Sequence, residues 1–413
     1  MSKPLHILVI NVFFAPHSYG GATIVAEQVA RRLVADHGVR VTAISGMSRA
    51  DLPAYATLRT EVAGIQNILI NLPPGRGYVE HYANPQVAAR IAEIARGVAP
   101  DIAHLHCLQE IGADAVAALK AQGLPVILST HDFWWLCERQ FMLRPDGRYC
   151  GQDPIRIDGC RGCAADLGAA RTRFEALGML GGLADIVTCP SDFALGLHAR
   201  SGFARDKLRV WTNGVRLPGP GFGAAQAARR AADPRLVFGY VGGPSAIKGW
   251  PLMRTAFGTL GRSDFRGILV DGSLEQRWWT ERHLRALQGE WSIHPRYDQE
   301  AIDDFFAKID VLVFLSQWKE TFGLTVREAL ARGVRVIQTD AGGAIEHGAH
   351  EAVRVVPIGC DPRRLRAEIL AELGVGARGC APVEVQGYAA QAQAFLEMAE
   401  GLTRRPMPQS GAA

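Results

Sequence analysis

Two glutamates separated by seven residues, Glu320 and Glu328, bound the segment Glu-Thr-Phe-Gly-Leu-Thr-Val-Arg-Glu. An ionised carboxylate only accepts hydrogen bonds and a sugar hydroxyl donates one, so this pair suits a ligand rich in hydroxyls. The apolar run at 310–316 has the composition of a buried strand, and the pattern becomes helical from Thr325 until Gly333 stops it. Both glutamates are therefore predicted near the carboxyl end of a strand, where open α/β sheets bind ligands.

Backbone amides between the two glutamates are predicted to face an anion. Gly323, Leu324 and Thr325 lie at the start of the expected helix, where the first N–H groups have no partner inside the helix. A diphosphate would suit this position. The pattern Thr325-x-x-Glu328 is also that of a capping box, in which Glu328 only closes its own helix terminus. The sequence leaves both roles of Glu328 open, whereas Glu320 has no comparable structural role.

Glycine pairs occupy two further predicted junctions between a strand and a helix. Gly20-Gly21 follows the first predicted strand, and Gly242-Gly243 precedes Lys248 at the corresponding point of the second half. Glycine lets a backbone approach a ligand closely, and a lysine ammonium can neutralise a departing diphosphate as a compact charge. Taken alone, Gly20-Gly21 also fits a tight turn, and Lys248 also fits an exposed surface lysine.

Histidines follow two strands of the first half. His131 comes after the predicted strand at 125–129, so its side chain is expected at the carboxyl end of that strand. A single histidine is also common as a packed or surface residue. His104 and His106, in the run Asp-Ile-Ala-His-Leu-His, are interpreted as structural residues around a buried strand.

Four cysteines, Cys137, Cys150, Cys160 and Cys163, lie close together in the sequence. The last two are separated by two residues, a spacing found in zinc knuckles, and four thiolates complete a tetrahedral structural zinc site. Such a closed site would hold loops together without performing chemistry. The alternative is a set of buried reduced cysteines or a redox pair.

Strands and helices alternate in two predicted series, which indicates parallel sheets covered by helices. The first series comprises strands at 5–12, 39–44, 102–106, 125–129, 185–189 and 208–211 and helices at 22–36 and 112–121. The second comprises strands at 236–241, 267–270, 310–316 and 334–339. The turn-rich segment that begins at Leu217 separates the two series and is interpreted as a linker.

Length and composition restrict the class of protein. The chain has 413 residues, of which 48% are hydrophobic, so two domains with their own cores are expected. A net charge of +4 from 45 basic and 41 acidic residues lacks the excess typical of nucleic-acid binders, so no nucleic-acid partner is expected. No signal peptide and no apolar run of about 20 residues is found, which predicts a cytoplasmic protein. The tail from Pro406 is predicted to be disordered.

The order of these motifs resembles that of the retaining family-4 glycosyltransferases, also called glycosyltransferase group 1, which have the GT-B fold. The resemblance covers nearly the whole chain. It is carried by Gly20-Gly21, His131, Asn213-Gly214-Val215, Lys248, the Glu-x7-Glu segment and Gly342-Gly343.

The resemblance implies an α/β protein with two Rossmann-like domains whose parallel sheets face each other across a cleft. It places the acceptor-side domain at 1–216, with a cysteine-rich insertion near 137–163, and the linker at 217–233. The domain for the nucleotide sugar follows at 234–386, and the terminal helix at 387–405 crosses back to the first domain.

Roles for single residues follow from the same resemblance. In the family the first glutamate contacts the transferred sugar and the second the ribose, which assigns these roles to Glu320 and Glu328. His131 matches a histidine that contacts the donor sugar, and Lys248 matches the lysine beside the phosphates. One position departs from the family pattern, because Gly243 stands where an arginine usually pairs with the phosphates.

The implied activity is transfer of a sugar, of the hexosyltransferase type, from a nucleotide diphosphate sugar to a glycan or lipid-linked acceptor in cell-surface polysaccharide or glycolipid synthesis. No catalytic divalent metal is expected, because the chain has no Asp-x-Asp. The alternatives are a nucleotide-sugar epimerase of the same fold and a non-catalytic scaffold that binds nucleotide sugars. A mixed basic and apolar segment near 169–179 is either a helix at the inner face of the cytoplasmic membrane or an ordinary amphipathic helix.

Overall fold

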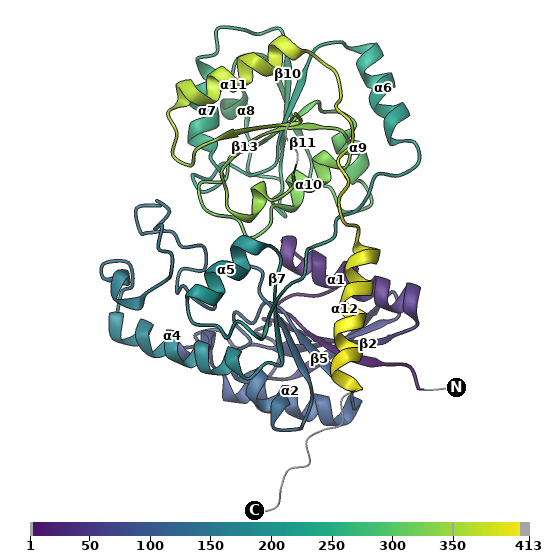
Figure 1. The fold of residues 1–413 in the computed structure, drawn as a ribbon, viewed down its shortest axis with the longest axis vertical. Coiled ribbons are helices and arrows are strands. Elements are labelled where there is room, and N and C mark those ends of the chain that lie inside the picture. Colours follow the sequence, from purple (N-terminus) through teal and green to yellow (C-terminus); the bar gives the residue numbers. More distant parts are fainter. Residues whose placement is uncertain (1–2, 349–350, 405–413) are drawn as a thin grey trace, which may run out of the picture. The chain divides into compact units, whose positions relative to one another are not determined.

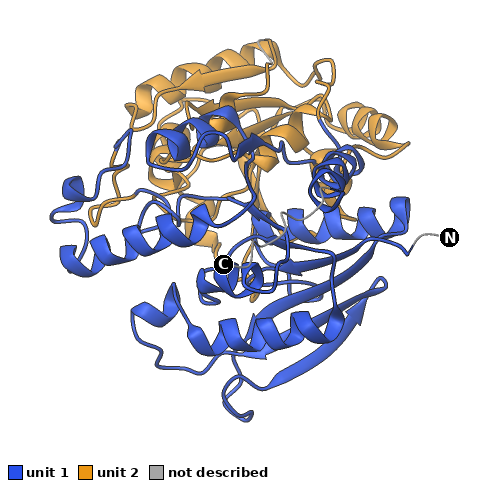
Figure 2. Cartoon of the chain, turned by 60° about the horizontal axis from the view of Figure 1, so that its bottom comes forward, with its two compact units in different colours: residues 1–142, 151–214, 386–413 blue, residues 143–150, 215–385 orange. Residues whose placement is uncertain are grey.

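The computed structural model of the chain describes residues 3–348 and 351–404, so the tail predicted to be disordered lies outside the described residues. The chain forms two compact units (Figure 2). Unit 1 comprises Met1–Met142, Gly151–Gly214 and Gln386–Ala413, and unit 2 comprises Leu143–Cys150 and Val215–Val385.

Unit 1 contains an eight-stranded sheet in the order β3-β4-β2-β1-β5-β6-β7-β8 (Figure 1). The strands are β1 His6–Ile10, β2 Arg40–Met47, β3 Thr57–Val62, β4 Ile65–Asn71, β5 Ile102–Leu105, β6 Val126–Ser129, β7 Ile186–Cys189 and β8 Leu208–Val210. All neighbouring strands are parallel except β3 and β4, which form an antiparallel hairpin. The predicted series missed this hairpin because β3 is largely exposed and mixes polar with apolar residues.

The helices of unit 1 cover this sheet. They are α1 Gly21–His37, α2 Pro85–Val98, α3 Asp114–Lys120, α4 Leu167–Gly182, α5 Asp192–Arg200 and α12 Tyr388–Thr403, with short 3-10 helices η1 Val79–His81 and η2 Ile157–Cys160. Helix α12 is the last element of the chain and packs on α1. Its Gln391 accepts a hydrogen bond from the backbone N–H of Gly214 at 2.6 Å, which anchors the helix beside the end of β8.

Unit 2 contains a six-stranded, fully parallel sheet in the order β11-β10-β9-β12-β13-β14. The strands are β9 Val237–Tyr240, β10 Arg266–Val270, β11 Glu290–His294, β12 Val311–Phe314, β13 Arg335–Thr339 and β14 Val353–Val356. Their apolar side chains form one hydrophobic core on each face of the sheet. The strand order reverses between β9 and β12, so the loops that follow these two strands open on the switch point of the sheet.

The helices of unit 2 are α6 Phe222–Ala232, α7 Trp250–Gly258, α8 Glu281–Leu284, α9 Ile302–Phe306, α10 Leu324–Leu330 and α11 Pro362–Val375, with the 3-10 helix η3 Gly343–Ile345. Helix α6 lies inside the segment 217–233 that was predicted to be a linker. Its Phe222 and Gln226 are buried, so most of this segment is an integral part of unit 2.

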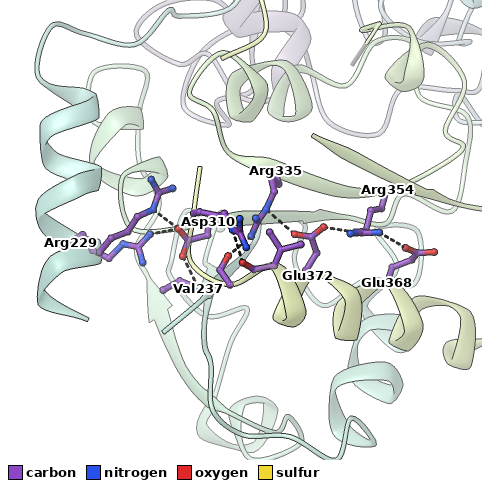
Figure 3. A network of polar contacts seen from close by, with 11 residues as sticks. Arg229, Val237, Asp310, Arg335, Arg354, Glu368 and Glu372 are labelled. Atoms are coloured by element: carbon purple, nitrogen blue, oxygen red, sulfur yellow. Dashed lines mark hydrogen bonds and ion pairs between the residues drawn. The ribbon is translucent and has the colours of Figure 1, made fainter. Parts of the chain in front are cut away.

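A network of ion pairs fixes the amino ends of the unit 2 strands (Figure 3). Asp310, which is completely buried just before β12, accepts hydrogen bonds from Arg229 at 2.6 Å, Arg230 at 2.8 Å and the backbone N–H of Val237 at 3.0 Å. Arg335 at the start of β13 pairs with Glu372 at 2.8 Å. A buried charge is tolerated only when it is paired in this way, so the network holds the strand ends opposite the loops that carry the sequence motif.

Candidate functional site

Lys248 and Glu320 meet at the switch point of unit 2. Lys248 lies in the loop after β9 and Glu320 in the loop after β12, and these two strands are hydrogen-bonded neighbours. The Lys248 ammonium donates to Oε1 of Glu320 at 2.8 Å, and the hydroxyl of Ser316 donates to the same oxygen. The lysine also lies 5.7 Å from the centre of the Trp318 ring, within cation–π range. Sequence reasoning named both charged residues but not their contact, and it missed Ser316.

The loop that carries Lys248 is fixed by the side chain of Tyr240, the last residue of β9. Its buried hydroxyl lies 3.1 Å from the carbonyl oxygen of Gly243 and 2.9 Å from that of Lys248, and donates its one proton to this pair. Gly249 has a φ of +82°, and a Cβ there would stand 2.3 Å from the carbonyl oxygen of Leu315. Only glycine fits this position, which keeps the two loops in contact.

Gly243, the position at which the sequence departs from the family pattern, is covered by a tryptophan. It has a φ of +68°, and a Cβ added there would lie 2.9 Å from the Trp278 ring. Trp278 is held in place by its backbone N–H, which donates to the buried carboxylate of Asp271 at 2.9 Å. A side chain at position 243 would therefore need both a strained backbone and a displaced tryptophan.

The Gly342-Gly343 loop is joined directly to Glu320. The backbone N–H of Gly343 donates to the carbonyl oxygen of Glu320 at 2.9 Å, and Glu320 and Gly342 form an isolated parallel bridge. The Gly342-Gly343 segment thus fixes the backbone of Glu320, and this restricts where the carboxylate can lie.

Arg327, between the two glutamates of the motif, ties the same loop to α10. Its guanidinium is buried and donates to the carbonyl oxygens of Gly343 at 2.8 Å and Ala344 at 3.0 Å, and also to that of Phe322. Burial lowers the pKa of Arg327 to about 10, so the side chain still carries its charge at neutral pH. Sequence reasoning missed this residue, although a second charge directly beside Glu328 on a short helix was a signal.

Helix α10 begins one residue earlier than the pattern indicated. Gly323 is the N-cap with a φ of +80°, and no side chain caps the helix. Leu324 and Thr325 are its first two residues, so the capping box from Thr325 to Glu328, one of the two roles left open for Glu328, does not form. Glu328 lies beyond the first helical turn rather than within it.

The carboxylate of Glu328 is buried. Burial raises its pKa, while the nearby charge of Arg332 and a hydrogen bond with Gln299 act in the opposite direction. Gln299 belongs to the segment after β11. Glu320 and Glu328 thus interact with different loops of the same sheet edge, the first with the loop after β9 and the second with the loop after β11.

The sequence-predicted residues of unit 1 lie after β1 and β6. Gly20 is the N-cap of α1 with a φ of +87°, and Gly21 is the first residue of this 17-residue helix. A Cβ added at Gly20 would meet no heavy atom within 4 Å, so the junction is open. The hydroxyl of Thr23 donates to the carbonyl oxygen of Tyr19 at 2.8 Å and orders the turn.

His131 lies in a loop that is fixed by its neighbour Asp132. This carboxylate accepts hydrogen bonds from the backbone N–H of Trp134 at 2.8 Å and from the side-chain amides of Gln140 at 2.6 Å and Gln109 at 3.0 Å. The Nε2 atom of His131 lies 2.8 Å from Nδ1 of His106. His106 was interpreted as purely structural from the sequence, yet it touches the predicted site residue directly.

The four cysteines do not form the predicted zinc site. Within residues 3–348 and 351–404, no group of three or more His, Cys, Asp or Glu side chains is arranged to hold a metal ion. The backbone turns at Cys160, where the N–H of Cys163 donates to the Cys160 carbonyl oxygen at 2.8 Å. Cys137 follows the His131 loop, and Cys150 ends a hairpin that groups with unit 2. The spacing predicted a zinc cluster, whereas in the described residues Cys160 and Cys163 lie in a local turn.

The segment near 169–179 forms part of α4, but its arginines do not share one exposed face. Arg173 is buried and donates to the carbonyl oxygen of Trp134 at 2.7 Å, whereas the exposed Arg171 pairs with Asp158. No helix in the described part of the chain is long and apolar enough to cross a membrane.

Two family models match the sequence. The model described as Glycosyltransferase Family 4 matches residues 19–218, and the model described as Glycosyl transferases group 1 matches residues 224–371. Together they cover both units and every motif discussed above except the terminal helix. Comparison with curated proteins gave no match.

Solved structures of similar fold cover almost the whole chain. A glycosyltransferase from Rickettsia africae is 17% identical with a TM-score of 0.64, covering 98% of this chain and 100% of that one. The sucrose-phosphate synthase of Thermosynechococcus elongatus is 18% identical with a TM-score of 0.66, covering 96% and 97%. HepE of Anabaena, solved in complex with UDP and glucose, is 16% identical with a TM-score of 0.62, covering 97% and 99%.

Proposed function

The chain belongs to glycosyltransferase family 4 and has the GT-B fold, and on this premise we propose that it transfers a sugar from a nucleotide diphosphate donor to a glycan or lipid-linked acceptor with retention of configuration. The observation that carries the proposal is the ion pair between Lys248 and Glu320 at the switch point of unit 2. This is the place where open α/β sheets bind nucleotides.

Lys248 is proposed to stabilise the charge that grows on the leaving diphosphate. An ammonium carries three N–H donors, and the bond to Glu320 uses one of them, so two remain for phosphate oxygens. The side chain is about one-third exposed, at 35%, which supports access for a ligand. A charge that is already in position stabilises the transition state without a reorganisation cost.

Glu320 is proposed to orient the transferred sugar. Both Lys248 and Ser316 bind its Oε1 atom, which leaves Oε2 to accept a hydrogen bond from a sugar hydroxyl. Because the carboxylate is held by two donors and its backbone by Gly343, it needs little adjustment when the sugar arrives. His131 of unit 1 is proposed to contact the same sugar.

Glu328 is proposed to bind the ribose of the nucleotide. The exclusion of the capping box removes one structural explanation for a carboxylate at this position. Its burial makes hydrogen bonds to hydroxyl donors strong, because water does not compete for the carboxylate.

Gly243 leaves the diphosphate without the arginine that usually pairs with it in the family. We propose that Lys248 and the backbone amides of Gly323, Leu324 and Thr325 neutralise the phosphates without a catalytic divalent ion, since the chain lacks Asp-x-Asp. Gly20 and Gly21 are assigned to the donor phosphates and the acceptor. On the family resemblance, we also propose that the transferred sugar is a hexose. On the same ground we propose a role in cell-surface glycan synthesis and a location at the inner face of the cytoplasmic membrane.

A panel of UDP-, GDP- and ADP-sugars tests the proposal by thermal shift. A donor that binds only the folded chain raises its stability by about 2.7 kcal/mol at a concentration of 100 Kd, so one nucleotide class should raise the Tm. The shift should be lost in Lys248→Ala and largely kept in Glu320→Ala, which should instead abolish transfer. Absence of a shift with every nucleotide sugar would overturn the proposal, and conversion of the donor without any acceptor would favour an epimerase.

A further inference from the structure

Three histidines of unit 1 lie side by side at the carboxyl ends of two paired strands. His104 is in β5 and His106 follows it, and His131 comes after β6. The rings of His104 and His106 have their centres 3.9 Å apart, and those of His106 and His131 lie 5.2 Å apart with nearly parallel planes. The function proposed above uses only His131, so the other two need an explanation.

His104 is satisfied by its surroundings. Its Nε2 lies 2.7 Å from the hydroxyl of Ser129, which in turn lies 2.7 Å from the hydroxyl of Thr188, and its ring stacks on Phe395. These contacts explain His104 as a packed core residue. They also fix the position of the His104 ring, which the His106 ring contacts.

The His106 ring has one hydrogen bond, and its other nitrogen has none among the described residues. Its Nδ1 lies 2.8 Å from Nε2 of His131, while its Nε2 is buried and has no hydrogen-bond partner among the described residues. Both rings are neutral at pH 7, because burial lowers the pKa of His131 to about 4 and that of His106 well below its ordinary value. A neutral imidazole carries one N–H and one bare nitrogen, so only one of the two rings donates.

The buried nitrogen of His106 decides which ring donates. If His106 carried its proton on Nε2, it would bury an N–H group with no acceptor, and such orphaned donors are rare and cost about 1–3 kcal/mol. With the proton on Nδ1 of His106, this N–H donates to Nε2 of His131, and the buried Nε2 of His106 carries no proton. The second arrangement is therefore favoured.

We propose that His106 is a positioning residue that holds His131 in the tautomer with its proton on Nδ1. In this arrangement Nε2 of His131 accepts from His106, and Nδ1 is the donor atom of the ring. His131 then acts as a neutral hydrogen-bond donor and not as a base. The inference rests on the proposed function only in its last step, where this donor binds an oxygen of the donor sugar.

The inference is tested by the tautomer of His131 in the full chain, measured by long-range proton–nitrogen NMR with labelled histidine. Assignment of the His131 signals uses their loss in His131→Gln. The wild type should show a protonated Nδ1 and a bare Nε2. His106→Leu removes the donor at similar size and should populate the other tautomer, whereas His106→Asn places an amide N–H near the former Nδ1 and should keep it.

Transfer activity gives the second measurement. His106→Leu should lower kcat by about 10- to 100-fold, by analogy with residues that orient metal-bound imidazoles, with a smaller change in the donor KM. His106→Asn should recover most of the loss. Equal Tm values for the two variants show that the difference is not one of folding.

A protonated Nε2 on His131 in the wild type would overturn the inference, and this spectrum decides even if His106→Leu does not fold. An unchanged tautomer in a folded His106→Leu would also overturn it. If the tautomer changes while kcat stays the same, the positioning by His106 stands and the role proposed for His131 in transfer is wrong. Failure of the two proposals is thus distinguishable.

Discussion

Lys248 and Glu320 are joined at 2.8 Å between two loops that lie 72 residues apart in the sequence. Ser316 donates to the same carboxylate oxygen, so the ligand-free chain already holds Glu320 by two donors on one side. The second oxygen remains for a ligand. This arrangement makes the site preorganised, and it allows the contributions of the three side chains to be separated by substitution.

Glu320→Gln should lower kcat about 100-fold or more, because the amide keeps the shape of the side chain but loses the charge that binds Lys248. Donor affinity, measured by the thermal shift with the identified nucleotide sugar, should change much less. Glu397→Ala, at an exposed position of α12, is the matched control and should leave both quantities unchanged. Wild-type transfer by Glu320→Gln would show that this carboxylate has no part in the reaction.

Ser316→Ala should have an intermediate effect. The hydroxyl is one of two donors to Oε1 of Glu320, so Lys248 still holds the carboxylate after the substitution. A hydrogen bond to a charged group contributes about 1.5–3 kcal/mol, or about 10- to 150-fold in rate, and the bond to Lys248 that remains predicts a loss in kcat near the lower end, about 10-fold. The double variant Ser316→Ala with Glu320→Gln should be no worse than Glu320→Gln alone. Additive losses in that double variant would contradict the shared contact.

Arg327→Met should destabilise the chain by about 3 kcal/mol, because it leaves the buried carbonyl oxygens of Phe322, Gly343 and Ala344 without their donor. Urea denaturation followed by circular dichroism measures this change. Arg327→Lys should recover only part of it, since a lysine keeps the charge but not the planar fork. The exposed Arg277→Met, which removes an arginine from the surface, should cost less than about 0.5 kcal/mol. Equal stability of Arg327→Met and wild type would refute the structural role.

Gly243→Ala should be more harmful than Gly75→Ala. Both glycines have a positive φ, +68° and +76°, but a Cβ at Gly243 meets the Trp278 ring at 2.9 Å whereas one at Gly75 meets nothing within 4 Å. The backbone term is about 1–2 kcal/mol in each case, so the difference in unfolding free energy isolates the clash with the tryptophan. Measured relative to Trp278→Ala alone, the cost of Gly243→Ala should fall to that of Gly75→Ala. If Gly243→Ala and Gly75→Ala lower the unfolding free energy equally, the Trp278 ring does not exclude a side chain at position 243.

Acid should destabilise the chain between pH 6.5 and about 4. Burial lowers the pKa of both His131 and His198 to about 4. Between pH 6.5 and about 4 these histidines therefore bind protons in the unfolded chain but not in the folded chain. Their contribution, up to about 3 kcal/mol each, is complete above pH 6.5 and is lost as the pH falls through this window. Unfolding free energy measured across the window should therefore decrease with falling pH.

His198→Gln should flatten this dependence, because it removes one of the buried imidazoles. His17→Gln replaces an exposed histidine and should leave the slope as it is. A slope that is identical in all three proteins would show that the buried His198 does not contribute.

The sequence by itself determined the α/β class, the family and the order of the motifs. These follow from local patterns. Short apolar runs such as 310–316 are typical of strands that are buried on both faces, and glycines such as Gly323 and Gly342 mark the junctions between strands and helices. Polar residues that follow the strand ends lie at the same edge of a parallel sheet. The positions of Lys248 and Glu320 after two strands of one series were predictable for this reason, whereas the adjacency of these strands comes from the structure.

Only the tertiary structure decided which atoms of these residues meet. The covering of Gly243 by Trp278 and the contact of His106 with His131 join residues from different loops, and no spacing along the chain encodes them. The bond of Ser316 to Oε1 of Glu320 lies within one loop, but it depends on how that loop is folded. For the same reason the cysteine spacing predicted a zinc cluster that the described residues do not form, because a ligand set depends on where distant loops place their side chains.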